Sequence, residues 1–83
     1  MAFKVVYKNS VARDLKKIDQ SDTQRILDEI EKELNRTPDS HPVLNGAFAG
    51  LRRFRIGDYR VVYAIVDDDV VVLRIGHRKD IYR

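Results

Sequence analysis

Two closely spaced arginines, Arg53 and Arg55, are the side chains of this sequence best suited to binding a phosphate. They lie in the segment LRRFRIGDYR, where arginine alternates with apolar residues. Because successive side chains of a strand point to opposite faces, both arginines would share one face, with Phe54 and Ile56 on the other. Like charges side by side repel each other, so this pattern favours an anion-binding site over a purely structural role.

Arg60 follows the turn Gly57-Asp58 and lies on the next expected strand, close enough to contact the same phosphate. Planar guanidinium groups match the oxygens of phosphate and carboxylate groups in bidentate geometry. The alternative is that these arginines are solvated and paired with nearby aspartates, an arrangement that is common and contributes little stability. Spacing alone leaves both interpretations open.

The C-terminal segment GHRKDIYR contains a second group of reactive side chains. His77, Arg78, Lys79 and Tyr82 supply an imidazole, a guanidinium, an ammonium and a phenol group. Together they could bind a phosphate and transfer protons if the tail folds back onto the sheet. A frayed terminus is the alternative. Ile81 argues against fraying, because it gives the tail an apolar side chain to bury.

The net charge of +3 is concentrated in the second half of the chain. Residues 43–83 hold eight Lys and Arg against five Asp and Glu, whereas residues 1–42 are balanced. Seven of the eight basic residues in the second half are arginine, as expected if they make oriented phosphate contacts. The absence of cysteine excludes a disulfide framework and thiolate chemistry.

Length and hydropathy predict one small soluble domain spanning residues 1–83. The amino-terminal segment MAFKVVYK lacks the apolar run of a signal peptide. The longest apolar run, Val61 to Val66, is too short to span a bilayer. We therefore expect a cytoplasmic protein with no membrane association.

The sequence does not predict a metal or cofactor site. Asp67, Asp68 and Asp69 lack the glycine and terminal glutamate of a calcium loop, so they are better explained as a device against aggregation in a hairpin turn. With only two histidines in the chain, a histidine-rich zinc site is not expected, and His41 is assigned no role.

Hydrophobic periodicity predicts the element order β-α-α-β-β-β. A strand over residues 3–7 precedes a helix that is capped by Asn9 or Ser10 and continues to Ile18. A second helix starts near Ser21, where Ser21 and Gln24 have the spacing of a capping box. Its apolar residues are Ile26, Leu27, Ile30 and Leu34, and Thr37-Pro38 ends it.

A long loop over residues 37–50 leads into three strands over 51–56, 59–66 and 70–75, joined by short turns. Short turns imply antiparallel neighbours. We therefore predict an α+β fold in which the helical hairpin packs on one face of a twisted, mainly antiparallel four-stranded sheet. The arginines at positions 53 and 55 would then lie on the open face.

A ribonuclease that uses no metal needs a proton acceptor, a proton donor and cations that stabilise the crowded phosphorane. Arginine suits the last task but not proton transfer, because its pKa stays above about 12. The residues that could carry protons are His77, Lys79, Asp80 and Tyr82.

The chain resembles the RelE/ParE toxins of bacterial and archaeal toxin–antitoxin pairs. The resemblance rests on the element order, on VLNGAFAGLRRFRIGDYRVVYAI (43–65) and on RIGHRKDIY (74–82). It implies a RelE-like fold and, for the RelE branch, an endoribonuclease that cleaves mRNA in the ribosomal A site without metal. The reaction is attack of the ribose 2′-hydroxyl on the adjacent phosphate, and a RelB-like antitoxin is the implied partner alongside ribosome and mRNA.

The resemblance also assigns roles to particular positions. It implies catalytic roles for Arg53, Arg55, Arg60, Arg78 and Tyr82, with His77 as a possible substitute base. Further RNA contacts are expected from Arg52, Arg74 and Lys79. Two alternatives remain, which are a ParE-like toxin that inhibits DNA gyrase without nuclease activity and a catalytically inactive module that binds RNA or a partner.

Overall fold

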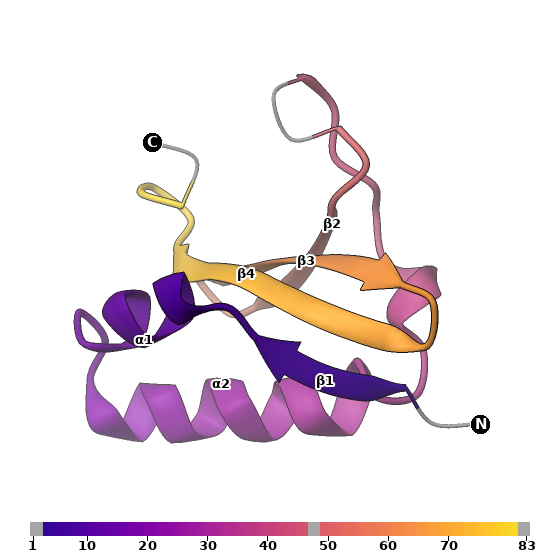
Figure 1. Cartoon of the computed structure of the whole chain (residues 1–83). Coiled ribbons are helices and arrows are strands. Elements are labelled where there is room, and N and C mark those ends of the chain that lie inside the picture. The colour runs from indigo at the N-terminus through magenta and orange to yellow at the C-terminus, as the bar shows by residue number, and fades with distance from the viewer. Residues whose placement is uncertain (1–2, 47–48, 82–83) are drawn as a thin grey trace.

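Two helices cover one face of a four-stranded sheet (Figure 1). The computed structural model describes residues 3–46 and 49–81. Among these residues, no helix combines the length and apolar character needed to cross a membrane. The elements in chain order are β1 (Lys4–Tyr7), α1 (Asn9–Leu15), α2 (Gln20–Glu33), the 3-10 helix η1 (Pro38–Ser40), β2 (Arg52–Ile56), β3 (Tyr59–Val66) and β4 (Asp69–His77).

The sheet has the strand order β1-β4-β3-β2. The pairs β2–β3 and β3–β4 are antiparallel, and β1 pairs with β4 in parallel. The prediction of a mainly antiparallel sheet is confirmed. The parallel pair follows from the connections. The helical hairpin carries the chain back so that β2 runs in the same direction as β1, and the two antiparallel hairpins then reverse the chain twice, so that β4 also runs parallel to β1.

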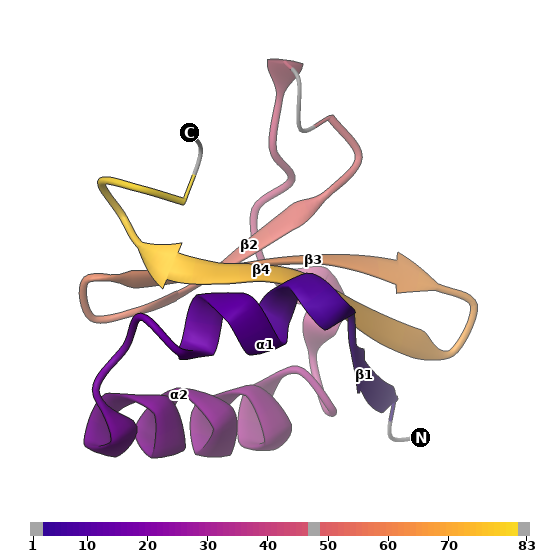
Figure 2. The same cartoon turned by 60° about the vertical axis from the view of Figure 1, so that its left-hand side comes forward.

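The helices and the C-terminal tail lie on opposite sides of the sheet. In Figure 2, α1 and α2 lie below it, while the tail after β4 and the segment before β2 rise above it. We call the face away from the helices the open face. Phe54 and Ile56 are buried toward the helices, and Arg53 and Arg55, which alternate with them, lie on the open face.

A β-bulge shifts the register between β3 and β4. Val62 pairs with Arg74, but Tyr63 pairs with Val72, so Leu73 is an extra residue on β4. As a result, Val72 and Ile75 both face the helices although they are three residues apart. A strict alternation along this strand would have placed one of them on the wrong face.

The main core lies between α2 and the helix-facing side of the sheet. Ile26, Ile30 and Leu34 are completely buried there, as the apolar stripe predicted. Tyr63 lies in the same core, and its hydroxyl donates a hydrogen bond to the carbonyl oxygen of Pro38. Burial raises the pKa of Tyr63 to about 12, so this phenol stays protonated and holds η1 against the sheet.

The predicted helix caps are wrong. The N-cap of α1 is Lys8, without a side-chain cap, because the Ser10 hydroxyl instead donates to the carbonyl oxygen of Leu73 (2.6 Å). The N-cap of α2 is Asp19, also without a side-chain cap, and Gln24 donates to Asp28 rather than back to the helix start. Tertiary contacts and within-helix pairs therefore replace the expected local capping bonds.

The end of α1, the β3–β4 turn and the segment before β2 also differ from the prediction. α1 ends at Leu15, and Ile18 packs against the core from the connection to α2. The β3–β4 turn consists of Asp67 and Asp68, while Asp69 already belongs to β4. The expected loop before β2 contains η1 and then pairs with β2, because Val43 forms a bridge with Arg52 and Arg53 donates its backbone N–H to the carbonyl oxygen of Pro42 (3.0 Å).

Candidate nucleic-acid interface

Three arginines lie together on the open face near the β2–β3 turn. Arg53 and Arg55 alternate along β2, and Arg55 pairs directly with Arg60 of β3. Side chains of directly opposed residues lie within contact distance of each other on the same face. The structure therefore brings together the three positions that the strand pattern predicted to be neighbours.

The turn itself orients two of these guanidinium groups. Arg55 Nε donates to the carbonyl oxygen of Gly57 (3.3 Å), and Arg60 Nη1 donates to the same oxygen (3.2 Å). Gly57 has a φ of 58°, a conformation that glycine adopts without strain. Two guanidinium groups thus converge on one carbonyl oxygen, and Arg60 Nη1 also donates to the carbonyl oxygen of Tyr59 (3.2 Å), so the turn holds both side chains in defined orientations.

The alternative of aspartate-paired arginines does not hold for Arg53 and Arg55. Within residues 3–46 and 49–81, no ion pair joins either guanidinium to a carboxylate. In this part of the chain, Arg74 is an arginine that pairs with a carboxylate, at 2.8 Å from Asp14. The positive charge on this part of β2 is consequently not neutralised by the described carboxylates.

The C-terminal tail is folded back rather than frayed. Arg78 N–H donates to the carbonyl oxygen of Asp58 (2.8 Å), which ties the tail to the β2–β3 turn. Arg78 and Lys79 are exposed, whereas Ile81 is buried. The tail therefore presents two further cations near the end of the sheet where the three arginines lie. Tyr82 lies outside the described residues.

His77 lies apart from the arginines. It pairs with Tyr59 on the face that the helices cover, and the two rings meet edge to face at 5.9 Å. Its Nδ1 accepts a hydrogen bond from the backbone N–H of Lys79 (3.3 Å). Since Arg60 and its partner Gly76 lie on the other face, His77 is not directed at the site where a phosphate would bind.

Arg52 and Arg74 hold parts of the fold together. Arg52 Nη1 donates to the carbonyl oxygens of Asp39 (3.2 Å) and His41 (2.8 Å), which fixes the segment before β2. Arg74 forms a bidentate pair with Asp14 of α1, and these hydrogen bonds raise the pKa of Arg74. Both guanidinium groups are thereby directed away from the three arginines near the turn.

Asp14 is a structural residue that no motif in the sequence singles out. It is 7% exposed, and its Oδ2 also accepts the backbone N–H of Ile75 (3.0 Å). β1 pairs with β4 only as far as Val72, so beyond that point α1 supplies hydrogen-bond partners for the edge of β4. In the sequence, Asp14 is a lone acidic residue within a short helix. This pattern is too common to identify its role.

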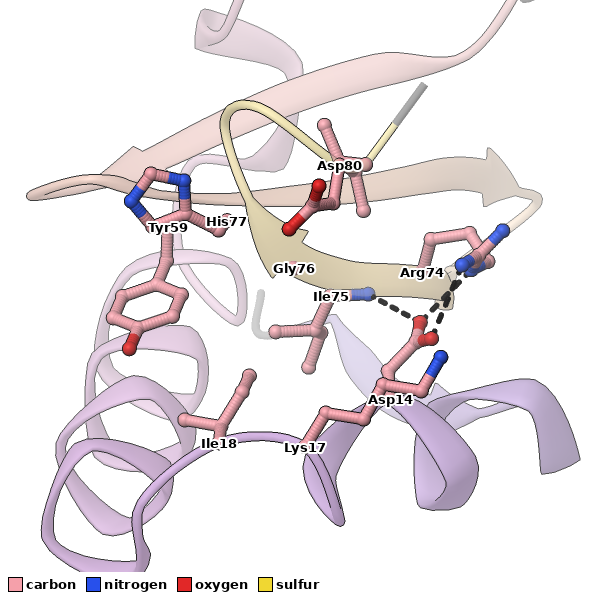
Figure 3. Close-up of a pocket in the computed structure, with 10 residues that line it drawn as sticks. Asp14, Lys17, Ile18, Tyr59, Arg74, Ile75, Gly76, His77 and Asp80 are labelled. Atoms are coloured by element: carbon pink, nitrogen blue, oxygen red, sulfur yellow. Dashed lines mark hydrogen bonds and ion pairs between the residues drawn. The ribbon is translucent and has the colours of Figure 1, made fainter. Parts of the chain in front are cut away.

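A pocket of about 320 Å³ lies between α1, the end of β4 and the tail (Figure 3). The Asp14–Arg74 pair lies on one side of it, and the rings of Tyr59 and His77 on the other. Within the described part of the chain, no cluster of histidine and acidic residues is suited to holding a metal ion. The lining residues are Asp14, Lys17, Ile18, Tyr59, Arg74, Ile75, Gly76, His77, Asp80 and Ile81.

Two helices on a mixed four-stranded sheet are also the fold of solved RelE-like toxins. Residues 5–82 match the family described as the ParE toxin of the type II toxin–antitoxin system parDE. The chain belongs to this family, within the RelE/ParE superfamily, and is thus a toxin of a type II toxin–antitoxin system. This confirms the family resemblance and the fold class predicted from the sequence.

The chain is similar to known toxins in sequence and in structure. Toxin RelG of Mycobacterium tuberculosis is 34% identical over 86 residues, covering all of this chain and 99% of the relative. The toxin–antitoxin complex RelBE2 of the same organism contains a chain with 30% identity and a TM-score of 0.84, covering 94% of this chain and 100% of that one. The ParDE system of P. aeruginosa has a TM-score of 0.76 over 92% of this chain and 96% of that one, but only 14% identity, so it shows the fold alone.

Proposed function

We propose that this toxin is an endoribonuclease that cleaves mRNA in the ribosomal A site and so inhibits translation. The observation that carries the proposal is the group of Arg53, Arg55 and Arg60 on the open face, two of them oriented by one carbonyl oxygen. Such a site suits a phosphodiester, whose oxygens accept the forked hydrogen bonds of guanidinium groups. The proposed substrate would place the protein in the cytoplasm.

The proposed reaction is attack of the ribose 2′-hydroxyl on the adjacent phosphate, which releases the 5′-oxygen of the next nucleotide. Negative charge builds up on the phosphorane, and preoriented cations stabilise it more than they stabilise the ground state. Arg55 and Arg60 would bind the non-bridging oxygens, with Arg53 and Arg78 binding flanking phosphates. These side chains need no proton transfer, which suits the high pKa of arginine.

The proton carriers are proposed to come from the tail. Lys79 is exposed beside Arg78, and Tyr82 follows in the sequence outside the described residues. His77 is a weaker candidate than the sequence indicated, because its ring contacts Tyr59 on the helix-covered face. This arrangement, with strong electrostatics and few proton carriers, predicts an enzyme that relies on its substrate being held in place.

Inhibition of DNA gyrase is the competing function, since the matching family is named after ParE. Similarity at the sequence level favours the RelE branch, because the relatives RelG and RelBE2 are 34% and 30% identical. The ParDE relative is only 14% identical. The unneutralised arginines on β2 add to this preference, because a phosphodiester substrate requires cations at the reacting centre.

Primer extension on mRNA in a purified translation reaction tests the proposed function. We expect the wild-type toxin to produce cuts only when ribosomes are present, because the proposed site holds its substrate weakly without them. Matched reactions without ribosomes and without toxin are the controls. Intact message together with growth arrest and DNA damage signalling would replace this function with gyrase inhibition, and intact message without arrest would indicate a binding module.

We further propose that a RelB-like antitoxin covers the open face. The solved RelBE2 relative is itself a toxin–antitoxin complex. Beyond the arginines, the open face carries small apolar residues from three strands, and Val66 among them is 53% exposed. An apolar patch beside a basic patch fits an acidic, amphipathic segment. The apolar residues are Val6, Ala64, Val66 and Val71.

Val66→Asp tests this placement of the antitoxin. A carboxylate in the apolar patch would have to be desolvated on binding, so we expect the dissociation constant to rise at least about tenfold. The measurement is calorimetric titration with the antitoxin encoded beside the toxin. Val43→Asp is the matched control, because Val43 is 51% exposed but pairs with Arg52, which alternates with Arg53 and therefore lies on the face opposite to the open face. Unchanged affinity for Val66→Asp would place the antitoxin on the helices instead.

A further inference from the structure

The tail packs onto the open face through Ile81, which lies against Gly76. Val62 and Ile81 are only 1% and 2% exposed, yet neither belongs to the core between the helices and the sheet. Val62 lies on the open face, where it pairs with Arg53 on one side and Arg74 on the other. The tail after β4, which includes Ile81, lies on this side of the sheet, as does the segment before β2 (Figure 2).

Ile81 occupies the space left by the missing side chain of Gly76. A Cβ atom added to Gly76 would lie 3.3 Å from Ile81 Cδ1 and 3.8 Å from its Cα and Cβ. Glycine within a strand often marks a close approach of this kind, so Gly76 is the feature of the sequence that indicates this contact. Gly76 is also the cross-strand partner of Arg60. Ile81 is therefore anchored next to one of the three arginines.

The same contact limits where Arg78 can lie. The backbone N–H groups of Asp80 and Ile81 both donate to the carbonyl oxygen of His77 (2.8 and 3.0 Å), which closes a tight turn. At the other end, Arg78 N–H is bonded to Asp58 in the β2–β3 turn. Arg78 is thus held between the turn that orients Arg60 and the buried side chain of Ile81.

We propose that Gly76 and Ile81 are positioning residues, which hold Arg78 at the phosphate site by packing the tail onto the open face. This inference rests on the proposed nuclease function. It assigns no chemical step to either residue. Their effect on cleavage passes through Arg78, so it disappears when Arg78 is absent.

The test compares Gly76→Ala, Ile81→Val and the double variant in the ribosome-dependent cleavage assay. Gly76→Ala requires Ile81 to shift by a few tenths of an ångström, so the maximal cleavage rate should fall at least about threefold, since small misplacements of catalytic groups have large effects. Ile81→Val removes Cδ1, the atom nearest the added Cβ, and the double variant should recover most of the lost rate. The ribosome concentration at half-maximal rate should stay within about twofold, because uniform binding is unchanged.

Two controls separate positioning from loss of stability. Ile30→Val removes a methylene from the helix-side core, away from the tail, and should leave the cleavage rate unchanged at a temperature where every variant is folded. In an Arg78→Ala background, Gly76→Ala should cause no further loss. A full-rate Gly76→Ala variant, an unrescued double variant, or an additional loss in the Arg78→Ala background would each overturn the positioning role. Wild-type toxin that never cleaves would instead overturn the proposed function, and the role of Arg78 with it.

Discussion

Replacing Arg60 by alanine is expected to lower ribosome-dependent mRNA cleavage at least about 100-fold, the scale seen when one preoriented donor to a developing oxyanion is removed. Arg60 lies opposite Arg55 and shares its carbonyl acceptor, so its loss also removes one of the two charges that converge at Gly57. The measurement is the single-turnover cleavage rate by primer extension, alongside thermal unfolding to confirm the fold.

Two further variants test whether the effect is specific to Arg60 and whether it depends on the geometry of the guanidinium group. Arg36→Ala removes an exposed arginine just after α2, on the side away from the open face, and should leave cleavage unchanged. Arg60→Lys keeps the charge but loses the forked geometry, so an intermediate rate is expected. Full cleavage by Arg60→Ala would rule out the arginine group as the catalytic site.

Replacing Asp14 by alanine is expected to lower the free energy of unfolding by about 2–3 kcal/mol, because a buried backbone hydrogen bond and two partly buried bonds to Arg74 are removed. The variant leaves the backbone N–H of Ile75 without its acceptor and Arg74 without its bidentate partner. Since Asp14 joins α1 to the part of β4 beyond β1, the packing of the helix on the sheet edge should loosen. Urea unfolding followed by circular dichroism measures the change.

A double-mutant cycle separates the two contacts of Asp14. Asp14→Asn keeps an oxygen acceptor for Ile75 N–H but loses the ion pair, and it should cost about half as much as alanine, because hydrogen bonds to charged groups are stronger than neutral ones. The effects of Asp14→Ala and Arg74→Ala should be less than additive, as expected for residues in direct contact. A loss below about 0.5 kcal/mol for Asp14→Ala would show that the network contributes little.

Much of the interface follows from local pattern. The alternation of arginine with Phe54 and Ile56 predicts which face of β2 is charged, because strand geometry leaves no other arrangement. The short Gly57-Asp58 turn then brings Arg60 beside Arg55. The element order follows in the same way from the change between periods of 3.6 and 2 along the chain. The catalytic assignments of Arg53, Arg55, Arg60, Arg78 and Tyr82 themselves stay proposals.

The sequence alone thus determines the order and type of the elements and the two faces of β2, because both depend on neighbouring residues. Only the tertiary structure decides the parallel pairing of β1 with β4, the bulge at Leu73 and the buried contact between Ile81 and Gly76. It also decides which basic residues remain available, since Arg74 and Arg52 are bonded to Asp14 and to the backbone before β2. These contacts join residues far apart in the chain, and no local periodicity encodes such pairings.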